Sequence, residues 1–135
     1  MAIIYLANTS PRLNRSVQRQ STFVALAGFQ MRLLAVVQLG ASSDRGRVRD
    51  DVPEIIKALS RCADGAPENA FRSSDGMSFG FFLTSDQPLG KTRSMIEGST
   101  GFRNSDALLL LEIGPEVAGA GFSRAWTWLQ HHPAR

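Results

Sequence analysis

Five arginines are the side chains of this sequence whose type and spacing favour a definite chemistry, the binding of an anion. Arginine presents a planar fork of donors that matches a phosphate or a carboxylate. Three of them alternate along one short charged segment, and the other two lie near later turns. The candidates for anion or nucleic-acid binding are Arg45, Arg47, Arg49, Arg72 and Arg103. The ligand class that this set predicts is a phosphate group or an acidic partner.

Aspartates in the same segments offer these arginines a different role. They are Asp44, Asp50, Asp51, Asp75 and Asp106. A network of ion pairs at the surface would neutralise the arginines, because exposed charges of opposite sign commonly pair in this way. Both interpretations stay open at this point.

Patterns for catalysis and for metal binding are sparse. The two histidines, His131 and His132, are adjacent near the C-terminus, with neither a second ligand cluster nor the partners of a catalytic triad. Neither of two glycine-containing loops, residues 40–43 and 98–101, continues into the lysine of a phosphate-binding loop. The sequence therefore favours a non-enzymatic protein without a cofactor, and it leaves open an enzyme that uses a divalent metal.

After Gln30, the sequence first predicts a strand and then a helix. Residues 33–39 are rich in branched apolar side chains and end at Gly40, which is typical of a strand. Residues 44–49 read as a charged loop. Asp51 with Glu54 forms a capping-box pattern, and the apolar residues up to Cys62 recur at spacings of three and four, so they predict one buried helix face.

The second half predicts a hairpin, a second helix and a last strand. Asp75-Gly76 lies between two extended runs within residues 68–84 and is a strong turn signal. Ser85 or Asp86 is positioned to cap a helix that runs to Gly98. Residues 106–113 contain four consecutive leucines, and an apolar run of this length predicts a strand covered on both faces.

This order of elements predicts an α+β fold. Strand, helix, strand, strand, helix and strand form the β-α-β-β-α-β pattern of a ferredoxin-like sandwich. The tight central turn excludes a crossover and hence a doubly wound sheet. We expect an antiparallel sheet in the order 4-1-3-2 with both helices on one face. This fold would bring the five arginines to one end of the sheet.

The last strand becomes an edge strand in this topology, although its continuous apolar sequence predicts that both of its faces are covered. A tail helix that bears two tryptophans, within residues 121–130, or a second subunit would supply that cover. The interface candidates are Leu108, Leu110, Phe122, Trp126 and Leu129. We therefore expect a homodimer that binds a protein partner.

Composition limits the number of domains, the compartment and the distribution of charge. At 135 residues the chain fits one domain, and the single cysteine, Cys62, fits a reducing compartment such as the cytoplasm. The net charge of +3 lies entirely in residues 1–30, which contain three arginines and no acid, so residues 31–135 are neutral. Residues 1–30 are either a flexible arm or a mis-called extension that precedes a true start at Met31, with a targeting segment as a third alternative. No stretch is long and apolar enough to predict a membrane span.

The C-terminal third has a resemblance to a known family. Residues 105–114, followed by Gly121-Phe122 and the tryptophan-bearing end, resemble the close of small SinR-like proteins, which are related to the CRISPR-associated nucleases of ferredoxin-like fold. The resemblance implies a dimer and, in the nuclease members, an aspartate near the end of the first strand that holds a divalent metal. Here that end reads Gln38-Leu39-Gly40, and the nearest acid is Asp44.

Two functions from different classes follow. The first is a non-enzymatic interaction module of ferredoxin-like fold that acts as a homodimer. The alternative is a nucleic-acid-binding protein or vestigial metal-dependent nuclease of SinR-like type, in which Asp44 would be the catalytic candidate.

Overall fold

A computed structural model describes residues 30–135 of the chain, so the interpretation of the N-terminal segment as an arm or an extension falls, apart from Gln30, outside the described residues. The element order is strand, two helices, two strands, helix, strand and helix. The elements are β1 (Met31–Gln38), α2 (Arg45–Asp50), α3 (Val52–Cys62), β2 (Glu68–Arg72), β3 (Ser78–Ser85), α4 (Leu89–Glu97), β4 (Ala107–Glu112) and α5 (Ser123–His131). Among residues 30–135, no helix has the length and apolar character that crossing a membrane requires.

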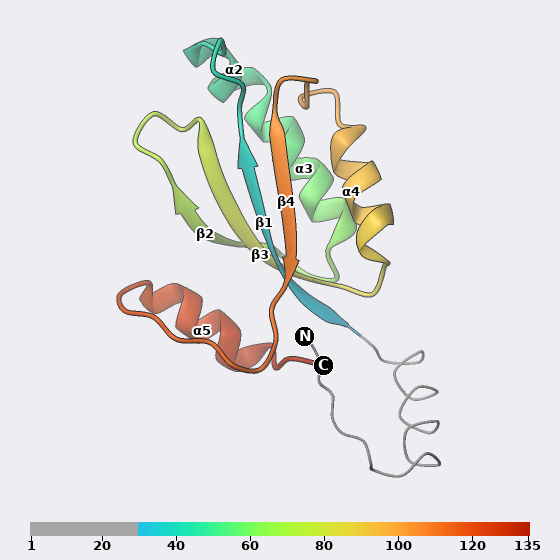
Figure 1. Ribbon diagram of the computed structural model, residues 1–135, viewed down its shortest axis with the longest axis vertical. Coiled ribbons are helices and arrows are strands. Elements are labelled where there is room, and N and C mark those ends of the chain that lie inside the picture. The colour runs from blue at the N-terminus through green and yellow to red at the C-terminus, as the bar shows by residue number, and fades with distance from the viewer. Residues whose placement is uncertain (1–29) are drawn as a thin grey trace.

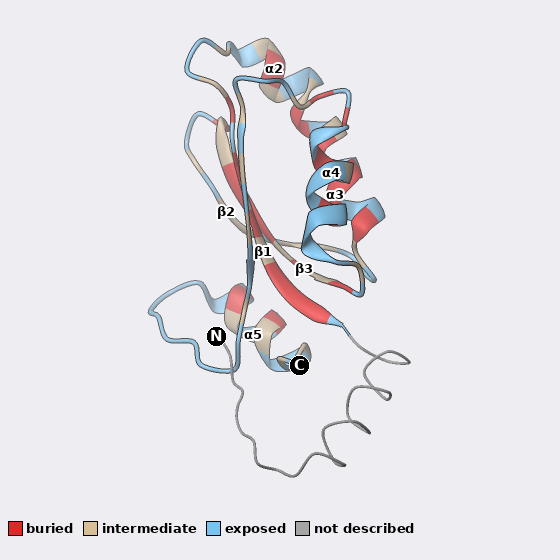
Figure 2. Cartoon of the chain, turned by 45° about the vertical axis from the view of Figure 1, so that its right-hand side comes forward, coloured by how far each residue is buried: buried red, intermediate tan, exposed pale blue. Residues whose placement is uncertain are grey.

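The four strands form one antiparallel sheet in the order β2-β3-β1-β4, with β1 and β3 at the centre (Figure 1). Read from the other edge, this is the predicted order 4-1-3-2, so the α+β class and the sheet order are confirmed. Helices α3 and α4 lie on one face of the sheet, and α5 lies at one end of the opposite side (Figure 2).

The core lies between the sheet and the two helices α3 and α4. Alternate residues of β1 and β3 point into it and pair across the strands, as Leu33 does with Leu83 and Val37 with Phe79. Helix α3 contributes one buried face, as its spacing predicts. Its buried residues are Val52, Ile55, Ala58, Leu59 and Cys62. This burial of alternating and helically spaced side chains holds the two layers together.

The expected loop of residues 44–49 is instead helix α2, which is a correction. Asp44 explains the difference, because its carboxylate accepts a hydrogen bond from the N–H of Arg47 and so caps the helix. The capping box expected at Asp51 and Glu54 is also wrong. The Asp51 side chain makes no cap hydrogen bond, since its carboxylate pairs with Arg47 and Arg103.

The hairpin turn is confirmed, whereas the expected cap of the next helix is not. Gly76 has a φ of 76°, a conformation that glycine adopts without strain, and the Asp75 carboxylate accepts from the N–H of Met77. Helix α4 begins after Pro88 without a side-chain cap, because the Ser85 hydroxyl accepts from the N–H of Gln87 instead.

Candidate functional site

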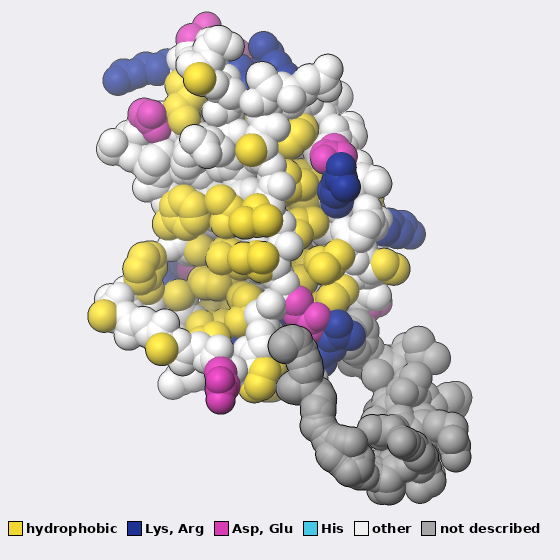
Figure 3. All heavy atoms as spheres, viewed as in Figure 1, with side chains coloured by type: hydrophobic (Ala, Val, Ile, Leu, Met, Phe, Trp, Pro, Cys, Tyr) yellow, Lys and Arg dark blue, Asp and Glu magenta, His cyan; other side chains and the backbone are white. Residues whose placement is uncertain are grey.

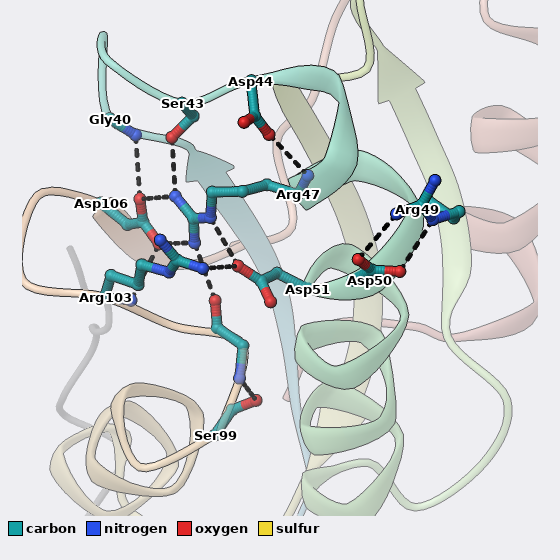
Figure 4. A network of polar contacts seen from close by, with 11 residues as sticks. Gly40, Ser43, Asp44, Arg47, Arg49, Asp50, Asp51, Ser99, Arg103 and Asp106 are labelled. Carbon is teal, nitrogen blue, oxygen red and sulfur yellow. Dashed lines mark hydrogen bonds and ion pairs between the residues drawn. The ribbon is translucent and has the colours of Figure 1, made fainter.

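The Arg47 side chain is the centre of a buried polar network at the end of the sheet where β1 stops (Figure 4). Its Nη1 and Nη2 atoms donate to the two carboxylate oxygens of Asp106 at 2.8 and 2.7 Å. Its Nε donates to Asp51, and its remaining donors reach the hydroxyl of Ser43 and the carbonyl of Gly101. Every N–H group of this guanidinium therefore donates a hydrogen bond within the protein.

Asp106 is equally enclosed, since its side chain has no exposed surface. Besides Arg47, its carboxylate accepts from the backbone N–H groups of Gly40 and Arg103. Burial raises the pKa of Asp106, but the hydrogen bonds from Arg47 and from these two N–H groups outweigh it and lower that pKa to about 2. The carboxylate thus ties β1, α2 and the loop before β4 together as an ion.

The other predicted anion-binding residues do not converge on one point. Arg49 pairs with Asp50, and Arg103 pairs with Asp51 at 3.1 Å. Arg72 places its guanidinium 5.9 Å from the centre of the Phe79 ring. Arg45 and Arg49 line a shallow hollow together with Val48, Ser74 and Asp75. Three of the five arginines therefore have acidic partners, as the ion-pair interpretation expects.

Asp44, the catalytic candidate implied by the resemblance, is an exposed residue that caps α2. Among residues 30–135, no group of three or more His, Cys, Asp or Glu side chains is placed where it could hold a metal ion.

The second feature of interest is the face of the sheet that turns away from α3 and α4, which we call the open face. It consists of Leu34, Val36, Phe71, Phe82, Leu109 and Leu111. Strand register places them together, because Leu34 is opposite Phe82 and Leu111, and Val36 is opposite Leu109. The ring of Phe71 lies over Gly80, which has no side chain to displace it. Hydrophobic side chains gather across the centre of this face (Figure 3).

Strand β4 supplies the most exposed part of the open face. Leu109 and Leu111 keep 54% and 45% of their surface exposed. The predicted interface residues Leu108 and Leu110 instead point to the other side and pack against the core. The outward leucines are thus the other alternating pair, as the period of two along a strand requires.

Helix α5 covers the open face at its β2 end, away from β4. The indole of Trp128 is buried, stacks on Phe82 with 5.3 Å between ring centres, and is itself covered by the ring of His132. Arg124 pairs with Glu68 of β2. The expected contact face of this helix is therefore displaced: Phe122 is 64% exposed, while Trp126 and Leu129 are half-buried.

Arg32 fixes the C-terminal end of α5. Its guanidinium is buried and donates to four backbone carbonyls, those of Ile113, Gly114, Leu129 and His132. Burial lowers the pKa of this arginine. A single side chain from β1 thereby joins the end of β4 to the end of α5.

Sequence reasoning overlooked Arg32 and the pair Leu109 and Leu111 as residues that shape this face, whereas it expected the tryptophan-bearing tail to supply cover. For the leucines, the strand period assigns alternate residues of residues 107–112 to opposite faces, but only the pairing of β4 with β1 decides which pair faces outward. No comparable signal marks Arg32, which occurs in a strand whose only other polar residue is Gln38.

Comparison with known proteins gave no match to a protein-family model, to a curated protein or to a solved structure.

Proposed function

We propose that this protein is a non-enzymatic interaction module of ferredoxin-like fold, which pairs with a second copy through the uncovered part of its sheet and binds a protein partner. The observation that supports this proposal is the open face. It combines aromatic and aliphatic side chains without a charged residue among its six members, and two of its leucines lie half-exposed at the sheet edge.

The chemistry of the open face favours a protein over a nucleic acid as its ligand. Protein interfaces concentrate aromatic and aliphatic groups and exclude charge at their centre, whereas surfaces that bind nucleic acids are rich in positive charge. The arginines that would serve the SinR-like alternative are mostly engaged elsewhere, since Arg47, Arg49 and Arg103 are paired with aspartates.

Light scattering on the full chain over a range of concentrations tests the proposal. We expect a reversible dimer, and we expect Leu109→Lys to raise its Kd by at least about tenfold, because a charged side chain would replace an apolar one at the contact. Val117→Lys is the matched control, since Val117 is a similarly exposed apolar residue outside the open face. It should leave the Kd unchanged.

Two results would contradict this function. One is a wild-type chain that stays monomeric at about 100 μM, well above a micromolar Kd. The other is tight, salt-sensitive binding to DNA or RNA at low ionic strength, which would instead support the nucleic-acid alternative.

A further inference from the structure

The two edges of the sheet are protected differently. Strand β2 has a register shift between Asn69 and Phe71, and Arg124 of α5 forms an ion pair with its Glu68. Bulges and charged side chains are the devices by which proteins prevent an added strand. Strand β4 (Ala107–Glu112) instead pairs without a register shift and contains four leucines in succession. An added strand therefore finds a suitable edge at β4.

The hydrogen bonds of β4 define which of its backbone groups point outward. The N–H of Ile113 donates to the carbonyl of Arg32, and the register continues with Leu111 opposite Leu34 and Leu109 opposite Val36. Bonded pairs alternate along an antiparallel ladder, so Leu109 and Leu111 bond toward β1. The backbone groups of Leu108, Leu110 and Glu112 consequently point away from the sheet.

We propose that two copies of the chain pair antiparallel through β4, about a two-fold axis at Leu110, and so join their sheets into one. This inference rests on the proposed function and specifies its interface. Leu110 then bonds to the partner's Leu110, and Leu108 bonds to the partner's Glu112. On the open face Leu109 lies directly opposite the partner's Leu111.

Neighbouring registers are less favourable. A two-fold axis at Leu109 would set Asp106 opposite the partner's Glu112, although the Asp106 N–H already donates to the carbonyl of Arg103. An axis at Leu111 would require the backbone of Gly114, whose carbonyl accepts from Arg32. The axis at Leu110 avoids both conflicts.

A second copy fits this edge because the edge is complementary to itself. The uncharged leucines of one β4 meet those of the other, and the two Glu112 residues lie at opposite ends of the paired strands, each beside its own Arg135. A six-residue strand is about 20 Å long, so the contact is at the low end of interface sizes. We therefore expect an equilibrium between monomer and dimer.

Disulfide trapping tests the register in the full chain. Cys62 is replaced by Ala, and Leu109→Cys and Leu111→Cys are made as separate proteins with different tags. Opposite residues in a non-bonded antiparallel pair have a separation that a disulfide can span, whereas residues offset by two do not. Mild oxidation of the mixture should therefore give about tenfold more cross-linked heterodimer than either protein gives homodimer.

Leu34→Cys is the control, because Leu34 is on the open face but in the central strand β1, away from the proposed contact. A dimer that is trapped through Leu34→Cys would overturn the β4 register and leave the proposed function standing. So would a dimer in which Leu109→Cys and Leu111→Cys form no cross-link. A monomer would overturn both. A monomer in which Leu109→Cys is shielded from a thiol reagent would show that another segment of the chain covers this edge.

Discussion

The guanidinium of Arg47 and the carboxylate of Asp106 face each other through two parallel hydrogen bonds, and both side chains are closed from water. Residues 59 positions apart in the chain are thereby fixed together at the end of the sheet. A buried pair of this kind stabilises little in comparison with an apolar pair, because desolvation offsets the attraction. The removal of one member is far more costly, since the other charge is left buried and unpaired.

Arg47→Ala should for this reason lower the free energy of unfolding by about 3–5 kcal/mol. Chemical denaturation followed by circular dichroism measures the change. Arg49→Ala is the matched control, because Arg49 belongs to the same helix but is exposed and paired only with its neighbour Asp50. Equal losses for the two variants would show that the Arg47 network does not hold this end of the fold.

Asp106→Asn should change how stability depends on pH. The folded-state pKa of Asp106 is about 2, below the ordinary value of 3.8 expected in the unfolded chain. A carboxylate with a lowered pKa stabilises the fold fully above the unfolded value, and this contribution is lost as the pH falls through the folded value. We therefore expect the stability difference between wild type and variant to be constant above about pH 5 and to shrink between pH 4 and pH 2.

Urea denaturation at intervals across this range provides the measurement. A stability difference that stays constant down to pH 2 would mean that Asp106 is not held as an ion in the folded state. Because the two proteins differ by one titratable group, the contributions of other acids cancel in the comparison.

The network around Arg47 shows in physical terms which features the sequence could predict and which it could not. The order of strands and helices, apart from α2, could be predicted because the apolar patterns of β1, α3 and β3 are local and strong. The role of Arg47 could not, since it depends on Asp106 from a loop that only the folded sheet brings close. Asp51 illustrates the competition directly, because the carboxylate that local sequence assigns to a helix cap is taken by Arg47 and Arg103.

The same limit applies to the open face. The four leucines of β4 correctly indicated a strand, but continuous apolar sequence carries no information about which residues face the core. That choice follows from the register with β1, which sets Leu110 beside Ala35 in the core and Leu109 beside Val36 outside. Trp128 was similarly ambiguous, because two tryptophans in one short helix leave its buried side undetermined by spacing alone.

Two glycines should respond in opposite ways to a single added methyl group. A Cβ at Gly80 would lie 2.3 Å from the Phe71 ring, so Gly80→Ala must displace that ring and should destabilise the fold by about 1–3 kcal/mol. A Cβ at Gly90, in α4, meets nothing within 4 Å, so Gly90→Ala should stabilise by about 0.5–1 kcal/mol. Thermal denaturation of both variants checks the signs. A neutral Gly80→Ala would indicate that Phe71 moves freely on the open face.

Trp128→Ala should release α5 from the sheet. The indole is buried between Phe82 and His132, and few other side chains of this helix are buried with it, so its truncation removes most of the apolar contact. We expect a loss of about 3 kcal/mol in the local stability of α5, measured as faster amide hydrogen exchange in residues 123–131. Exchange in β1 and β3 should stay slow, because their core lies on the other face. Phe122→Ala, which truncates an exposed aromatic residue beside the same helix, should leave exchange in α5 unchanged. If Trp128→Ala has no greater effect than Phe122→Ala, the carbonyl contacts of Arg32 rather than the aromatic stack hold α5 in place.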